Sequence, residues 1–238
     1  MFRNVILLIL LIFVSESLLS QRKNSYGQNI RMYKTDRVLL AINYLHWQEL
    51  PAQIDLENIN RGFYLGYFID NPIGGSRISL AFGLSLSTVN LYSDAIPTSI
   101  IDSSCTGADF IKIKDICQLS DDYKSNKMAF TYAGIPVELR LRFGKSESFK
   151  IAFGFEAGIL ATSYVKYKGP DFYLKNNDEI KIKYFNIKHS TSFRYGPSFR
   201  IGYNRFTFRA FYPLTKTFEE GSGKNAFPIE IGLSLMVF

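Results

Sequence analysis

The sequence predicts an all-β fold, an eight-stranded antiparallel up-and-down transmembrane β-barrel that follows an N-terminal signal peptide. Three observations predict it: an export signal at the N-terminus, segments that alternate apolar and polar residues with a period of two, and connections that alternate between short and long. Composition agrees, because 16% of the 238 residues are aromatic, and aromatic residues favour strands.

Residues 1–20 have the features of a secretory signal peptide. Arg3 gives a basic start, an apolar run extends from Val5 to Val14, and small or polar residues follow. This run is too short for a transmembrane helix, which needs about 20 residues. We expect cleavage near Ser20, a short periplasmic N-terminal segment at residues 21–36, and the barrel at residues 37–238.

The alternation is clearest in RISLAFGLSLS, where the apolar residues from Ile78 to Leu86 share one face and small or polar residues share the other. It recurs in IPVELRLRF at 135–143 and in FKIAFGFEAGI at 149–159. A soluble β-sandwich or lipocalin-like barrel also alternates, with its apolar face turned inward. Alternation therefore leaves the soluble and the membrane barrel open.

The lengths of the connections favour the membrane barrel. We expect strands at 37–47, 62–70, 76–91, 128–143, 149–165, 184–201, 205–214 and 227–238. The sixth is expected to project beyond the bilayer, with a bulge near Tyr184. Short connections at DNPIGG, GKSES and GYN alternate with long ones, and both termini fall on the side of the short turns. This is the layout of a bacterial outer-membrane barrel, so we expect that location, with periplasmic termini.

Charged residues on the inward face predict an ion network in a lumen filled by side chains. Its expected members are Glu138, Arg140, Glu156, Arg194, Arg209 and Glu230. Of these, Glu138, Glu156, Arg194 and Glu230 are expected in one layer near mid-membrane. A basic periplasmic mouth is expected from Arg77, Arg142, Lys150 and Arg200. Buried charges need partners, so we interpret the layer as structural, and the alternative is a gated polar path or an anion-attracting mouth.

Catalysis, metal binding and cofactor binding are not expected. The two histidines are His46 and His189, and a histidine that acts as a general base needs a nucleophile within hydrogen-bond reach. Only Thr191 shares a strand face with His189, and that face is expected to point to lipid or to the outer rim. The sequence shows no paired-Cys or paired-His spacing typical of zinc sites. Nucleic acid is not an expected partner of an exported barrel despite the pI near 9.3. Cys105 and Cys117 lie in the longest loop, and export to an oxidising compartment predicts a disulfide between them.

The C-terminal PIEIGLSLMVF is expected to be the last barrel strand, with Ile231 and Leu233 facing lipid, Glu230 facing inward, and closure against the first strand. The terminal Phe238 resembles the signal that barrel assembly machinery recognises, although the apolar positions here are offset from it by one residue.

The stretches RGFYLGYFID, RISLAFGLSLSTVNLYS, YAGIPVELRLRFG, FKIAFGFEAGIL and RYGPSFRIGY, with the terminal Phe, resemble the PorT-like outer-membrane β-barrel proteins of Bacteroidetes. The most specific part is IPVELRLRF at 135–143. The resemblance implies an outer-membrane barrel and a link to an envelope machine such as type IX secretion. We therefore expect a structural or interaction barrel whose partners are outer-membrane lipids, the assembly machinery and other envelope proteins. The alternative is a small transport or lipid-modifying barrel.

Overall fold

The computed structural model describes residues 37–51, 54–57, 59–73, 77–100, 110–117, 123–143, 148–171, 176–219 and 225–237. The expected signal peptide, the segment 21–36, Cys105 and Phe238 lie outside these ranges. Signal cleavage, the disulfide to Cys117 and the terminal assembly signal therefore stay predictions.

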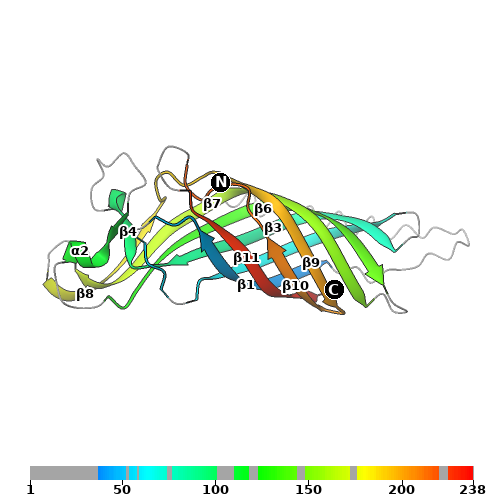
Figure 1. The fold of residues 1–238 in the computed structure, drawn as a ribbon, viewed down its shortest axis with the longest axis horizontal. Coiled ribbons are helices and arrows are strands. Elements are labelled where there is room, and N and C mark those ends of the chain that lie inside the picture. The colour runs from blue at the N-terminus through cyan, green and yellow to red at the C-terminus, as the bar shows by residue number, and fades with distance from the viewer. Residues whose placement is uncertain are drawn as a thin grey trace, which may run out of the picture. The chain divides into compact units, whose positions relative to one another are not determined.

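Eight long strands close into one antiparallel barrel (Figure 1). They are β1 (Val38–Gln48), β2 (Arg61–Pro72), β3 (Ile78–Tyr92), β6 (Ser125–Phe143), β7 (Phe149–Asp171), β9 (Phe193–Tyr203), β10 (Phe206–Phe211) and β11 (Phe227–Val237). Each pairs with the next in this order, and β11 pairs back with β1 from Val38↔Val237 to Gln48↔Phe227. The expected fold class and the expected closure of the last strand against the first are confirmed.

The two ends of the barrel differ in their connections. One end, the short-turn end, has links of only two to five residues, at 73–77, 144–148 and 204–205. Asn204 adopts the left-handed φ of 52° that a two-residue turn needs. The other, the long-loop end, carries β4 (Ala95–Pro97), the 3-10 turn Thr98–Ile100, β5 (Phe110–Lys112), α2 (Ile113–Cys117) and β8 (Asn176–Phe185). Figure 1 shows α2, β4 and β8 together at that end. The barrel's first strand begins and its last strand ends at the short-turn end.

The expected sixth strand at 184–201 is wrong in its N-terminal part. Residues 176–185 form a separate strand, β8, which pairs with the outer part of β7 through Tyr164↔Phe185, and β9 begins only at Phe193. Asn186 and His189 between them have φ of 61° and 57°, a left-handed conformation that ends the ladder. The change in the alternation of side chains near Tyr184, which was expected to be a bulge, is therefore a break between two strands. The projecting element is the β7–β8 hairpin.

The outward side chains near the short-turn end form an apolar belt around the barrel. Its exposed members are Ile42, Phe63, Leu65, Ile78, Leu80, Phe82, Leu84, Leu86, Ile135, Val137, Leu139, Phe143, Phe149, Phe153, Phe155, Ile159, Phe193, Phe206, Phe208, Ile231 and Leu233. An exposed apolar surface this extensive marks contact with membrane or protein. On β3 it runs from Ile78 to Leu86, the length that a tilted strand of about 9–11 residues needs to cross a bilayer.

Beyond the belt, the two faces of the strands exchange character. On β3 the side chains of Val89 and Leu91 are buried inside, while Asn90 points outward. On β6 Phe130 is buried inside and Lys127 points outward. Outward polar side chains indicate water or headgroups rather than hydrocarbon at this level. The strands therefore continue past the membrane into the long-loop end.

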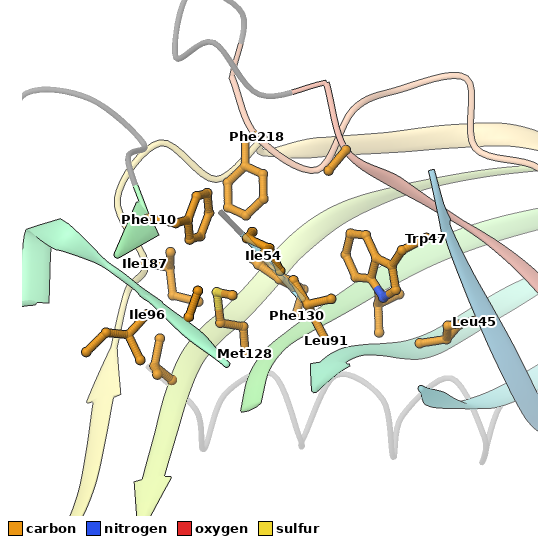
Figure 2. Packing of buried hydrophobic residues seen from close by; sticks show 14 of the residues in the cluster. Leu45, Trp47, Ile54, Leu91, Ile96, Phe110, Met128, Phe130, Ile187 and Phe218 are labelled. Carbon is orange, nitrogen blue, oxygen red and sulfur yellow. The ribbon is translucent and has the colours of Figure 1, made fainter. Parts of the chain in front are cut away.

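A cluster of buried apolar side chains fills the barrel interior at the long-loop end, and we call it the apolar plug (Figure 2). Its members are Leu45, Trp47, Ile54, Val89, Leu91, Ala95, Ile96, Phe110, Ile113, Met128, Phe130, Tyr132, Val165, Tyr167, Ile187, Phe218 and Ala226. Phe218 meets Phe110 and Phe130 edge-to-face at ring distances of 5.2 and 5.8 Å. The described parts of the long links thus fold over the strands and close this end.

The belt predicts a position-dependent cost for a charge on β6. Arginine in place of Leu139, in the middle of the belt, should destabilise the barrel by about 2–4 kcal/mol, because hydrocarbon does not solvate the guanidinium. Thr131, on the same outward face beyond the belt, is the matched control, and Thr131→Arg should cost about 0–1 kcal/mol. Reversible unfolding in lipid vesicles measures both. Equal costs at the two positions would contradict the assignment of the belt.

Candidate functional site

The barrel interior between the short-turn end and the apolar plug is the candidate site, because it holds buried charged groups. The outward neighbours of these groups are the apolar residues of the belt, so the two-residue period of each strand turns the charges inward. They form two chains of ion pairs, one beside the plug and one nearer the short-turn end.

The first chain joins Arg194, Glu230, Arg209 and Glu156. Arg209 reaches Glu230 and Glu156 with its two terminal nitrogens, each at 3.1 Å from a carboxylate oxygen. Arg194 donates to the other oxygen of Glu230. Neutral side chains complete the shell: Asn43 donates to Glu230 at 2.5 Å, and the Ser85 hydroxyl donates to Glu156 at 2.9 Å.

The second chain joins Arg200, Glu138, Arg140, Asp70 and Arg142. Glu138 accepts from Arg200 Nη2 at 2.6 Å and from Arg140 Nε at 2.8 Å. Asp70 lies 3.5 Å from Arg140 Nη1 and accepts from Arg142. All five side chains are at most 7% exposed, so the chain is shielded from solvent. Five arginines and four carboxylates give the two chains together one excess positive charge.

Aromatic rings stack on the arginines and fill the remaining width of the lumen. Arg209 lies 3.9 Å from the ring centroid of Tyr64, Arg194 4.4 Å from Phe211, and Arg140 4.5 Å from Phe68. Gly66 on β2 leaves room for two of these rings, since a Cβ there would meet Phe68 and Tyr64 at 2.8 and 2.9 Å.

A cavity of about 10 Å³ at the short-turn end is lined by Arg140, Arg142, Lys150 and Arg200, with Ile151, Ala152, Thr207 and Met236. This is room for about one water molecule.

The structure brings together the six residues of the expected ion network but groups them differently. Glu156, Arg194 and Glu230 share one chain with Arg209, whereas Glu138 belongs to the second chain with Arg140. The expectation of a single layer containing Glu138 is therefore wrong. Its physical reason is the register of the β6–β7 hairpin, in which Glu138 lies opposite Gly154 and therefore two residues nearer the short turn than Glu156.

Neighbouring carboxylates reduce the positive charge of the expected basic mouth. Arg142 and Arg200 are buried and paired with Asp70 and Glu138, and Lys150 is half-buried beside the small cavity. Arg77 directly precedes β3 and is exposed at the short-turn end, so its part in a basic mouth stays a prediction.

Asp70 is the acid that sequence reasoning missed. It shares the inward parity of Tyr64 and Phe68 on β2, and this alternation was a usable signal. Ser79, which accepts a hydrogen bond from Arg142 at 2.8 Å, was missed because small residues on the inward face of a strand carry no charge signal.

The two histidines lie apart from the ion network. His46 points outward and its ring stacks on that of Tyr44, with 6.4 Å between the ring centroids. The Nδ1 atom of His189 lies 3.8 Å from Oε2 of Glu219. Ser190 beside it donates its hydroxyl to the Ile187 carbonyl. Within the described ranges, no group of three or more His, Cys, Asp or Glu side chains is arranged to hold a metal ion. None of the helices described is long and apolar enough to cross a membrane.

A closed eight-stranded barrel with an apolar belt outside and paired charges inside defines a transmembrane β-barrel of the outer-membrane class. The chain belongs to the outer membrane protein beta-barrel domain family, whose model matches residues 26–219. Its location is accordingly the bacterial outer membrane. No curated protein matches the chain.

The ion network predicts a strong effect of removing one charge. Glu230→Gln leaves Arg194 without its carboxylate partner and Arg209 with only Glu156, so the variant should lose about 3–5 kcal/mol of unfolding free energy. Adding Arg194→Met should restore most of this loss, because the unpaired charge is then removed as well. Urea unfolding in vesicles, monitored by tyrosine fluorescence and gel mobility, measures the unfolding free energies of the unaltered protein, both single variants and the double variant. Additive losses in the double variant would contradict the coupling.

Proposed function

We propose that this protein is a structural or interaction barrel with a sealed interior, which acts through the surfaces it presents at the two faces of the outer membrane. The observation that supports this most directly is the continuous filling of the lumen: the second ion chain, the first ion chain and the apolar plug follow one another from the short-turn end to the long-loop end. A transport barrel needs an open path, and the filling of the lumen by these side chains supports a sealed interior instead.

The proposal includes an orientation. Outer-membrane barrels have short periplasmic turns and longer extracellular loops, so the short-turn end, with both ends of the barrel chain, is periplasmic. The long-loop end with β4, β5, α2 and β8 is then extracellular. The export signal expected at residues 1–20 and the disulfide expected between Cys105 and Cys117 fit this route.

The resemblance to PorT-like barrels extends the proposal to a role beside an envelope machine such as type IX secretion. The β7–β8 hairpin projects beyond the barrel and offers a surface for such a partner. Catalysis is not part of the proposal, since the Ser190 hydroxyl beside His189 donates to the Ile187 carbonyl and not to the imidazole.

Purification of the tagged protein from its own outer membrane, after reversible crosslinking, tests the proposal. We expect envelope proteins in stoichiometric amounts, and we expect the same preparation to give no steady conductance in a planar bilayer. A matched preparation of Glu230→Gln with Arg209→Gln, which breaks the first ion chain, serves as the comparison for a loosened lumen. Recovery of a lone protein that conducts steadily would contradict the proposal and favour the transport barrel.

A further inference from the structure

Three lysines lie side by side on the outer surface of neighbouring strands at the long-loop end. Lys127 on β6 is directly opposite Lys166 on β7, and Lys166 is directly opposite Lys183 on β8. Lys166 and Lys183 are exposed, and Lys127 is half-buried. We call these three residues the lysine row. Because adjacent strands are about 4.8 Å apart, the row spans about 10 Å.

The lysine row is electrostatically unfavourable in the protein by itself. Like charges directly opposite one another destabilise a sheet. Among the described residues, no carboxylate lies within ion-pair distance of any of the three. The same surface does pair two other lysines, since Glu179 lies 3.0 Å from Lys168 and also binds Lys124. These two hydrogen bonds lower the pKa of Glu179 to about 2. The row is thus the part of this surface that an anion would stabilise.

Aromatic rings hold two of the ammonium groups in place. Lys183 Nζ lies 4.2 Å from the ring centroid of Tyr164 and 4.6 Å from that of Phe185. Lys127 Nζ lies 5.6 Å from Tyr92 and 5.9 Å from Tyr164. Such contacts attract cations through the ring quadrupole. They position the charges before a ligand arrives, which reduces the entropy lost on binding.

The height of the row above the apolar belt restricts the ligand. The belt ends on β3 at Leu86, and Tyr92, the neighbour of Lys127, follows six residues later. With a rise of about 3.3 Å per residue and a tilt of about 40°, the row lies roughly 15 Å above the belt. The headgroup zone of a phospholipid leaflet is only about 5–8 Å thick. A phospholipid phosphate therefore lies too low, whereas a glycolipid whose headgroup and core sugars carry phosphates extends to this height.

We propose that the lysine row binds phosphate groups of lipopolysaccharide, the phosphorylated glycolipid of the outer leaflet. This inference rests on the proposed function for its orientation, because the long-loop end must be extracellular. The row supplies three cations over about 10 Å, a spacing that accommodates two phosphates. Tyr164 and Phe185 beside it supply apolar rings on which sugar faces pack.

The test measures binding of purified lipopolysaccharide to the detergent-solubilised full chain by native mass spectrometry and titration. Changing Lys127, Lys166 and Lys183 together to Gln should weaken binding roughly tenfold to a hundredfold, since each basic residue near an anionic lipid contributes about 1 kcal/mol. Lipopolysaccharide whose phosphates have been removed by phosphatase should bind the unaltered protein as weakly as the intact form binds the triple variant.

The matched control removes three exposed positive charges elsewhere. Arg77→Gln, Lys114→Gln and Arg205→Gln give the same change in net charge on other elements, and should leave lipopolysaccharide binding within about twofold of the unaltered protein. Equal losses in both triple variants would show an effect of net charge only and overturn the site. Unchanged binding in the lysine variant, or equal affinity for phosphatidylglycerol vesicles, would also overturn it.

A separate measurement distinguishes failure of the orientation from failure of the site. An epitope inserted between Ser222 and Gly223, in the link before β11, should be accessible to antibody on intact cells. If the epitope is protected on intact cells but the protein still binds lipopolysaccharide in detergent through the lysine row, the proposed orientation is overturned and the binding site stands. Accessible epitope with no effect of the lysine variant would overturn the site and leave the orientation standing.

Discussion

The structure depends on the pairing of β11 with β1, because hydrocarbon offers no hydrogen-bond partner to the backbone of an open sheet edge. Eleven residue pairs from Val38↔Val237 to Gln48↔Phe227 remove both edges. Closure then fixes two surfaces with opposite requirements. The outer one must be apolar where it meets lipid, and the inner one must be filled, since eight strands enclose a space that side chains can occupy.

The interior meets its requirement in two chemically different ways. At the level of the belt, inward positions carry charges, and each buried carboxylate there meets at least one arginine, as Glu230 meets Arg194 and Arg209. Beyond the belt, where the outer surface is polar, apolar residues such as Phe130 and Phe218 form the plug as they would in a soluble barrel. The point of exchange on each strand locates the edge of the membrane. It also sets the height of the lysine row above the belt.

Sequence periodicity was sufficient for the closed barrel and for the charges that face inward, because a strand's two-residue period assigns each side chain to a face. It did not predict that Glu138 and Glu156 belong to different ion chains, because an approximate count from the turns does not fix the pairing register, in which Glu138 lies opposite Gly154. The strand break at Asn186 was predicted only as a bulge, because a change in alternation marks an irregularity without showing whether the ladder continues, and the backbone φ shows the interruption. The plug was missed because its residues come from four barrel strands and from several links that are far apart in the sequence.

The central claim is that the outer face of the strands changes from apolar to polar, and the inner face from polar to apolar, at the edge of the membrane. Fluorescence quenching by brominated lipids tests this claim most directly. The sequence has one tryptophan, Trp47, which lies buried in the plug. Its fluorescence should not be quenched by lipids brominated in their acyl chains, whereas F82W, which adds a tryptophan to the belt, should introduce strongly quenched emission. Strong quenching of Trp47 in the unaltered protein, or no quenching of the added tryptophan, would contradict the account.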